Sequence, residues 1–135
     1  MNLDLGLLIL RIGIGGSVAW FHGWGKISSP AKWEQIGGAM SNLGIHFAPT
    51  VFGFLAAFSE FGAALMIAFG LYFRVATSLL GFTMFVAVLV HLNMEPGPMA
   101  GWNGASHALE LLIVCVALFL SGPGKYVLAL KKGSS

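Results

Sequence analysis

Four long apolar stretches, separated by short polar segments, make up the hydropathy pattern of this chain. A bilayer core about 30 Å thick needs roughly 20 apolar residues per helix, and each stretch reaches or approaches that length. The pattern therefore predicts an all-α fold, a membrane four-helix bundle that forms a single domain over residues 1–135. The predicted spans are residues 5–22, 49–72, 75–92 and 104–121.

The connecting segments predict how the spans are arranged. Only Phe73 and Arg74 separate the second and third stretches, which forces an antiparallel hairpin. Proline and glycine in residues 93–98 predict a loop before the fourth stretch. Between the first two stretches, a serine–proline pair is a typical helix start, and apolar residues follow it at helical spacing. We expect a short amphipathic helix over residues 30–43, lying in the membrane interface.

Composition supports the membrane assignment and excludes other classes. The chain is 57% hydrophobic and 9% charged, whereas soluble domains contain about a quarter charged residues. A net charge of +2 with no dense basic run argues against a nucleic-acid partner. The lone cysteine, Cys115, cannot form an intramolecular disulfide.

Basic residues near the ends of the spans predict the orientation. Four spans place both termini on one side of the membrane. The basic residues on that side are Arg74, Lys125, Lys131 and Lys132, against Lys26 and Lys32 on the other. Residues 131–135 form a polar tail. By the positive-inside rule we expect a multi-pass protein of the cell inner (cytoplasmic) membrane with both termini cytoplasmic.

Three charged residues interrupt the apolar stretches: Arg11, Glu60 and Glu110. A charge at mid-bilayer costs roughly 2.5–3.5 kcal/mol on translocon-type scales, so such residues usually face a protein interior and pair. Counted at 1.5 Å per residue, Arg11 and Glu60 lie at similar depths. We therefore expect a buried ion pair between Arg11 and Glu60.

A second polar group is predicted near the outer leaflet. Its candidate members are His22, Lys26, His91, His107 and Glu110. His107 and Glu110 are three residues apart and share a helix face. An acid, imidazoles and a lysine near one mouth of the bundle can exchange protons with water, as quinone chemistry requires. In this interpretation Glu110 and a histidine move protons, and Lys26 holds a ring oxygen.

The same histidines are candidate ligands of a metal ion or a haem. Zinc needs three or four ligands, and His22, His91 and His107, with Glu110, come from three helices without a local ligand motif. We therefore predict no metal site and keep a metal-binding membrane protein as an alternative. Haem needs only one or two axial histidines in an apolar slot. His22 with His91 or His107 could serve, so haem remains an alternative cofactor.

Small residues crowd the first stretch. The pairs Gly13/Ser17 and Gly15/Ala19 have the small-xxx-small spacing that lets membrane helices approach closely. Either pair predicts a tight packing face, and a dimer seam is compatible with them.

With these residues placed, nearly the whole chain resembles the DoxX family of small four-helix bacterial membrane proteins. The resemblance rests on an ordered set of motifs. They are Leu10-Arg11-Ile12-Gly13, His22-Gly23-Trp24-Gly25-Lys26, Glu60-Phe61-Gly62-Ala63-Ala64-Leu65 followed by Gly70 and Arg74, then Glu110, and last Gly122-Pro123-Gly124. The chain departs from the family where Val127-Leu128-Ala129 replaces a frequent serine-leucine-aspartate.

The resemblance implies a function linked to quinone oxidoreductases or oxidative stress, and distant relatives act as assembly chaperones. We therefore expect a redox-associated, quinone-linked accessory subunit. The alternatives are a non-catalytic scaffold or assembly partner of a larger membrane complex, and a haem- or metal-binding membrane protein. The expected partners are the lipid bilayer and either a larger membrane complex or further copies of the chain in a homo-oligomer. A transporter ranks third, because the chain has neither a second structural repeat nor a broken helix pair.

Overall fold

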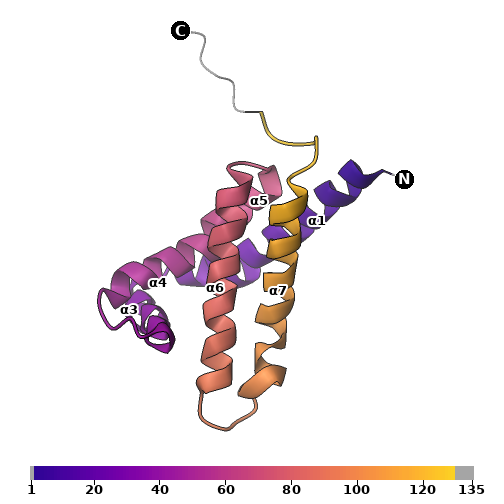
Figure 1. Ribbon diagram of the computed structural model, residues 1–135. Coiled ribbons are helices and arrows are strands. Elements are labelled where there is room, and N and C mark those ends of the chain that lie inside the picture. The colour runs from indigo at the N-terminus through magenta and orange to yellow at the C-terminus, as the bar shows by residue number, and fades with distance from the viewer. Residues whose placement is uncertain (1, 130–135) are drawn as a thin grey trace.

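The structure, a computed structural model, describes residues 2–129. Four helical stretches are long and apolar enough to cross a membrane (Figure 1), which confirms the all-α prediction with four spans. They cover Leu3–Ile27, Pro49–Phe69, Phe73–Asn93 and Gly101–Ser121. Within residues 2–129 no strand is present. Lys131 and Lys132, used in the charge count, and the polar tail lie outside the described residues.

Each of the first two spans is interrupted by one π-helical turn. The first span consists of α1 (Leu3–Val18), the π-turn η1 (Ala19–Gly23) and α2 (Trp24–Ile27). The second consists of α4 (Pro49–Phe58), the π-turn η4 (Ser59–Ala63) and α5 (Ala64–Phe69). A π-turn inserts an extra residue into a helix and is frequent at functional sites. The third and fourth spans are the uninterrupted helices α6 (Phe73–Asn93) and α7 (Gly101–Ser121).

The connector between the second and third spans is displaced from the predicted position. The second span ends at Phe69, and Gly70 follows it with a φ of +73°, which is available to glycine without strain. The N–H of Leu71 donates to the Met66 carbonyl at 2.8 Å, and the N–H of Gly70 donates to the Ile67 carbonyl at 3.1 Å. This is the Schellman arrangement of a helix end. Residues 70–72 therefore form the connector, and α6 begins at Phe73.

The predicted amphipathic helix over residues 30–43 is three short segments. They are the 3₁₀ turn η2 (Pro30–Lys32), the α-helical α3 (Trp33–Gly37) and the 3₁₀ segment η3 (Gly38–Leu43). The segment packs onto α4 through glycines. A Cβ on Gly37 would lie 1.6 Å from the Pro49 carbonyl oxygen, and one on Gly53 would lie 1.7 Å from the Trp33 carbonyl oxygen. Backbone contact with α4 therefore determines where the segment lies.

In space, α6 and α7 run side by side as a hairpin, and α1 and α4 run obliquely to it (Figure 1). The core between them is made of small and branched apolar side chains, including Ala64, Ile67, Leu80, Leu111 and Leu118. Of the small-residue pairs on the first span, Gly15 and Ala19 face this core. Gly13 has open space where a Cβ would stand, and Ser17 is exposed.

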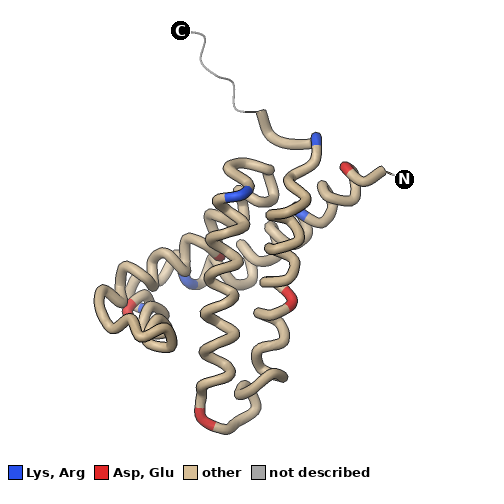
Figure 2. The backbone as a smooth tube through the Cα atoms, viewed as in Figure 1, with Lys and Arg blue, Asp and Glu red and all other residues tan. Residues whose placement is uncertain are grey.

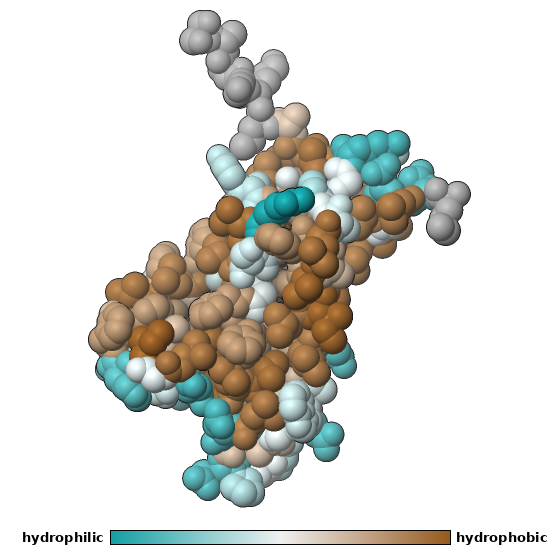
Figure 3. Space-filling view, viewed as in Figure 1, coloured by the Kyte–Doolittle hydropathy of each residue, from teal (hydrophilic) through white to brown (hydrophobic). Residues whose placement is uncertain are grey.

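The outer surface is suited to lipid. Large apolar side chains are exposed on every span, among them Ile12, Phe54, Phe82 and Ile113. Hydrophobic residues cover most of the visible face, and hydrophilic residues gather toward the ends (Figure 3). Charged residues are sparse along the helices (Figure 2). The exposed apolar surface and the span lengths together describe a multi-pass membrane protein.

Candidate functional site

The two π-turns pack directly against each other. A Cβ on Gly23 of η1 would lie 2.3 Å from the carbonyl oxygen of Glu60 in η4, so only glycine permits this contact. Earlier in the first span, Gly15 makes a similar approach to the Ala64 backbone, where a Cβ would lie 2.4 Å from the carbonyl oxygen. The glycine face of the first span thus brings the second half of that span onto the second span at Glu60.

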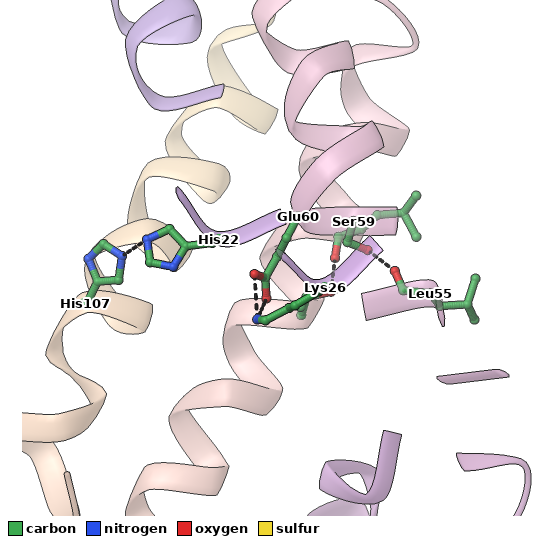
Figure 4. A network of polar contacts seen from close by, with 8 residues as sticks. His22, Lys26, Leu55, Ser59, Glu60 and His107 are labelled. Atoms are coloured by element: carbon green, nitrogen blue, oxygen red, sulfur yellow. Dashed lines mark hydrogen bonds and ion pairs between the residues drawn. The ribbon is translucent and has the colours of Figure 1, made fainter. Parts of the chain in front are cut away.

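This approach produces an ion pair between Lys26 and Glu60. The Lys26 Nζ lies 2.7 Å from both Glu60 Oε1 and Oε2 (Figure 4). The Glu60 side chain is 5% exposed, whereas that of Lys26 is 36% exposed. The carboxylate is therefore buried inside the membrane-spanning region, and the lysine reaches inward from α2 to neutralise it.

The predicted pairing of Arg11 with Glu60 was wrong. It rested on depths counted along straight α-helices, which placed Lys26 too close to the outer surface. Lysine carries its charge on a flexible four-carbon chain, and the contact between η1 and η4 brings Glu60 within its reach. The partner of Glu60 was thus decided by helix crossing rather than by depth alone.

Arg11 lies instead against the segment that follows α7. The side chain is fully buried, and its Nη2 donates to the Tyr126 carbonyl oxygen. The same segment is attached to α5 by the Leu128 N–H, which donates to the Phe69 carbonyl at 2.9 Å. Arg11 therefore helps to fix the carboxyl-terminal segment, and its Nε and Nη1 have no partner among residues 2–129.

A cavity of about 280 Å³ opens beside the Lys26–Glu60 pair. Its walls come from α3, η3, α4 and α6, and Lys26, Ser59, Glu60 and His91 supply polar groups to the lining. The remaining lining residues are almost all apolar: Ile36, Gly37, Ala39, Met40, Phe52, Leu55, Ala56, Leu79, Phe82, Thr83, Val86, Ala87 and Val90. An apolar pocket with a few convergent polar groups is the usual form of a small-molecule site.

The polar lining residues can both donate and accept hydrogen bonds. An ammonium carries three N–H donors, and the two oxygens of Glu60 engage two of those of Lys26. The Ser59 hydroxyl donates to the Leu55 carbonyl at 2.8 Å, which leaves its oxygen as an acceptor. His91 Nδ1 lies 2.7 Å from the Met99 carbonyl and must donate to it, so a neutral ring presents Nε2 as an acceptor.

The other predicted pocket residues lie outside this cavity. His22 of η1 and His107 of α7 contact each other, with their Nε2 atoms 3.3 Å apart (Figure 4). Glu110 is exposed on α7 and has no hydrogen bond or ion pair within the described part of the chain. The structure thus divides the predicted outer cluster. Lys26 and His91 line the cavity, His22 pairs with His107, and Glu110 faces outward.

The predicted set of three or four metal ligands does not come together among the described residues. Within residues 2–129, no group of three or more His, Cys, Asp or Glu residues is placed to hold one ion. Axial histidines of a haem lie on opposite sides of the macrocycle. His22 and His107 are in direct contact, so as they stand they do not offer that arrangement.

Two features of the site were missed by sequence reasoning. Ser59 is buried beside Glu60 and lines the cavity. The small residues Ala56 and Ala87 make room for the cavity on α4 and α6. A serine directly before the glutamate was the available signal, whereas alanines in apolar helices carry no signal of a cavity.

A family model described as DoxX matches residues 6–92. The chain belongs to the DoxX family. The match includes Arg11, His22, Lys26, Glu60 and His91, and it covers all residues that line the cavity. It ends before α7, which carries His107 and Glu110. A search of curated proteins and a search of solved structures each returned no match.

Proposed function

We propose that this DoxX-family membrane protein is a redox-associated accessory subunit that binds the head group of a quinone-class molecule in the cavity beside Lys26 and Glu60. The observation that carries the proposal is an ion pair between Lys26 and the buried Glu60 carboxylate in the lining of a largely apolar cavity. The family resemblance to quinone-linked proteins agrees with this ligand class.

The donor set of the cavity fits such a ligand. A quinone presents carbonyl oxygens, which accept hydrogen bonds, on an apolar ring. The third N–H of Lys26 can donate to one carbonyl while Glu60 retains the other two. The apolar walls from α4 and α6 suit the ring, and 280 Å³ is close to the lower limit of typical ligand pockets. A lipophilic tail would then extend into the bilayer.

The residues of the chain have separate roles in this proposal. When bound, the quinone supplies reversible two-electron, two-proton chemistry, with electrons from a redox partner protein. Lys26 orients the ligand by a charge-assisted hydrogen bond. Glu60 holds Lys26 in place and can accept or donate a proton at its carboxyl group. Phe52 and Val86 exclude water from the ring.

Binding of a short-chain, water-dispersible quinone to the purified protein in lipid nanodiscs tests the proposal. We expect Lys26→Met to weaken binding at least tenfold, because it removes the donor. Ala87→Phe should fill the cavity and abolish binding. Ala117→Phe, on the exposed face of α7, is the matched control and should bind as the wild type does. Equal binding by all four proteins, or no saturable binding by the wild type, refutes the proposal.

A second function, docking to a partner in a larger membrane complex, is favoured by Glu110. An exposed carboxylate within an apolar span is costly in lipid and is usually covered by protein. We expect gentle-detergent capture with wild-type protein to recover a partner that Glu110→Leu loses and Glu95→Leu, in the loop after α6, retains. A chain recovered alone from every lipid-like medium contradicts this role.

We also propose that both termini are cytoplasmic and that the membrane is the cell inner membrane. The Lys125 Nζ lies 3.4 Å from Asp4 Oδ2, and the backbone N–H of Lys125 donates to Asp4 Oδ1 at 3.1 Å. These contacts join the segment after α7 to the start of α1, which supports termini on one side. Arg74 and Lys125 add positive charge there. Cysteine labelling of Asn2→Cys and of Ser41→Cys, each in a Cys115→Ala background, should show opposite accessibilities from the two sides.

A further inference from the structure

The contact between His22 and His107 joins two spans that are far apart in the sequence. The rings come from η1 and α7, and their centroids lie 5.0 Å apart with planes inclined by 31° (Figure 4). Both side chains are exposed, and neither lines the cavity. The proposed quinone function therefore gives this pair no role.

The distance between the two Nε2 atoms is that expected for two ligands of one tetrahedral metal ion. Two imidazole nitrogens bound at about 2.0–2.1 Å to one tetrahedral ion lie about 3.3–3.4 Å apart. The Nε2 atoms of His22 and His107 are 3.3 Å apart. A linear two-coordinate ion with similar bond lengths would hold them about 4 Å apart. The observed separation therefore corresponds to one edge of a tetrahedral site.

We propose that His22 and His107 form a two-histidine site for a divalent transition-metal ion of the zinc class, with its remaining positions open to water or an external ligand. Neutral imidazole nitrogens are good ligands for such ions. The site is an open one, because no third His, Cys, Asp or Glu among residues 2–129 completes it. Open positions are characteristic of catalytic or ligand-exchanging sites rather than structural ones.

The charges around the pair are compatible with a cation. Glu110 lies three residues after His107 on α7 and is exposed on the same face, where it supplies a negative charge. The positive charge of Lys26 is directed to Glu60 and neutralised by it. The site thus assigns a role to the otherwise unpaired Glu110.

Titration of the full-length chain with Zn²⁺ and Co²⁺ tests the proposal. The protein is prepared without a polyhistidine tag and held in nanodiscs of zwitterionic lipid, so that neither tag nor headgroup charge binds metal. We expect saturable binding with the intense visible absorption of tetrahedral Co²⁺. His22→Ala and His107→Ala should each weaken binding at least tenfold, whereas His46→Ala should leave it unchanged.

A conservative variant separates loss of a ligand from loss of the fold. Cysteine is also a zinc ligand, so His107→Cys should restore binding that His107→Ala removes, with the thiolate-to-cobalt charge-transfer band as its signature. Absence of saturable binding, unchanged affinity in His22→Ala or His107→Ala, or a weak octahedral cobalt spectrum overturns the proposal. Quinone binding is measured independently through Lys26→Met, so either proposal can fail without the other.

Discussion

Replacement of Lys26 by methionine tests how the buried carboxylate is stabilised. Methionine keeps an unbranched chain but removes the charge, which leaves Glu60 with 5% of its side chain exposed and no cation beside it. Breaking a fully buried pair from one side costs about 3–5 kcal/mol. The Lys26 side chain is 36% exposed, so some water reaches the pair, and we expect a loss of about 2–4 kcal/mol in the free energy of unfolding.

Replacement of the carboxylate instead of the lysine should lower the free energy of unfolding much less. Glu60→Gln leaves Lys26 partly exposed and able to reach water, and the amide oxygen still accepts one hydrogen bond. We expect a loss of about 1 kcal/mol in the free energy of unfolding. The double variant should be more stable than Lys26→Met alone, because a neutral amide is less costly to bury than an unpaired carboxylate. Removal of the lysine is thus predicted to destabilise the protein more than removal of the carboxylate.

Unfolding by SDS in mixed micelles, followed by tryptophan fluorescence, measures all four proteins. The slopes against SDS fraction must agree before the free energies are compared. Equal losses for the two single variants would refute the asymmetry. A double variant less stable than Lys26→Met would refute the claim that Glu60 is stranded when the lysine is removed.

Backbone contacts and Arg11 give three further predictions. Gly23→Ala should lower the free energy of unfolding by about 1–3 kcal/mol, because its Cβ would overlap Glu60. Gly25→Ala is the control, since a Cβ there has open space, and it should change the Tm little. Equal shifts for the two variants would contradict the packing of the π-turns. Gly70→Ala should lower the Tm, because its φ is +73° and its Cβ would overlap Arg11; an unchanged Tm would show that the connector can relax. Arg11→Met should leave the Tm within a few degrees of wild type, because a buried charge is replaced by an apolar chain. The same variant should speed proteolysis after Ser121. Unchanged proteolysis would contradict the role of Arg11 in fixing the carboxyl-terminal segment.

Much of the fold could be read from the sequence because lipid imposes strong rules. A span needs about 20 apolar residues and internal backbone hydrogen bonds, so hydropathy alone predicted four helices. The structure places them at nearly the predicted positions, with the first span extended to Ile27 and the second shortened to Phe69. The glycine in position 70 was a visible stop signal, although the prediction placed the turn later.

The site was only partly predictable. Charged residues in or beside apolar spans stand out, so Arg11, Lys26 and Glu60 were all identified as candidates. Their pairing was wrong because depth along a straight helix ignores where two helices cross. The π-turns η1 and η4 change the direction of the side chains that follow them. No sequence pattern used for the prediction reports such a turn.

The chain by itself determined that four apolar helices span a membrane and that the few charges within them must be satisfied. Only the tertiary structure decided that Lys26 neutralises Glu60, that Arg11 is covered by the carboxyl-terminal segment, and that a cavity remains beside the ion pair. The reason is physical. Hydropathy is a property of each segment, whereas pairing depends on the close approach that Gly23 allows at one crossing point.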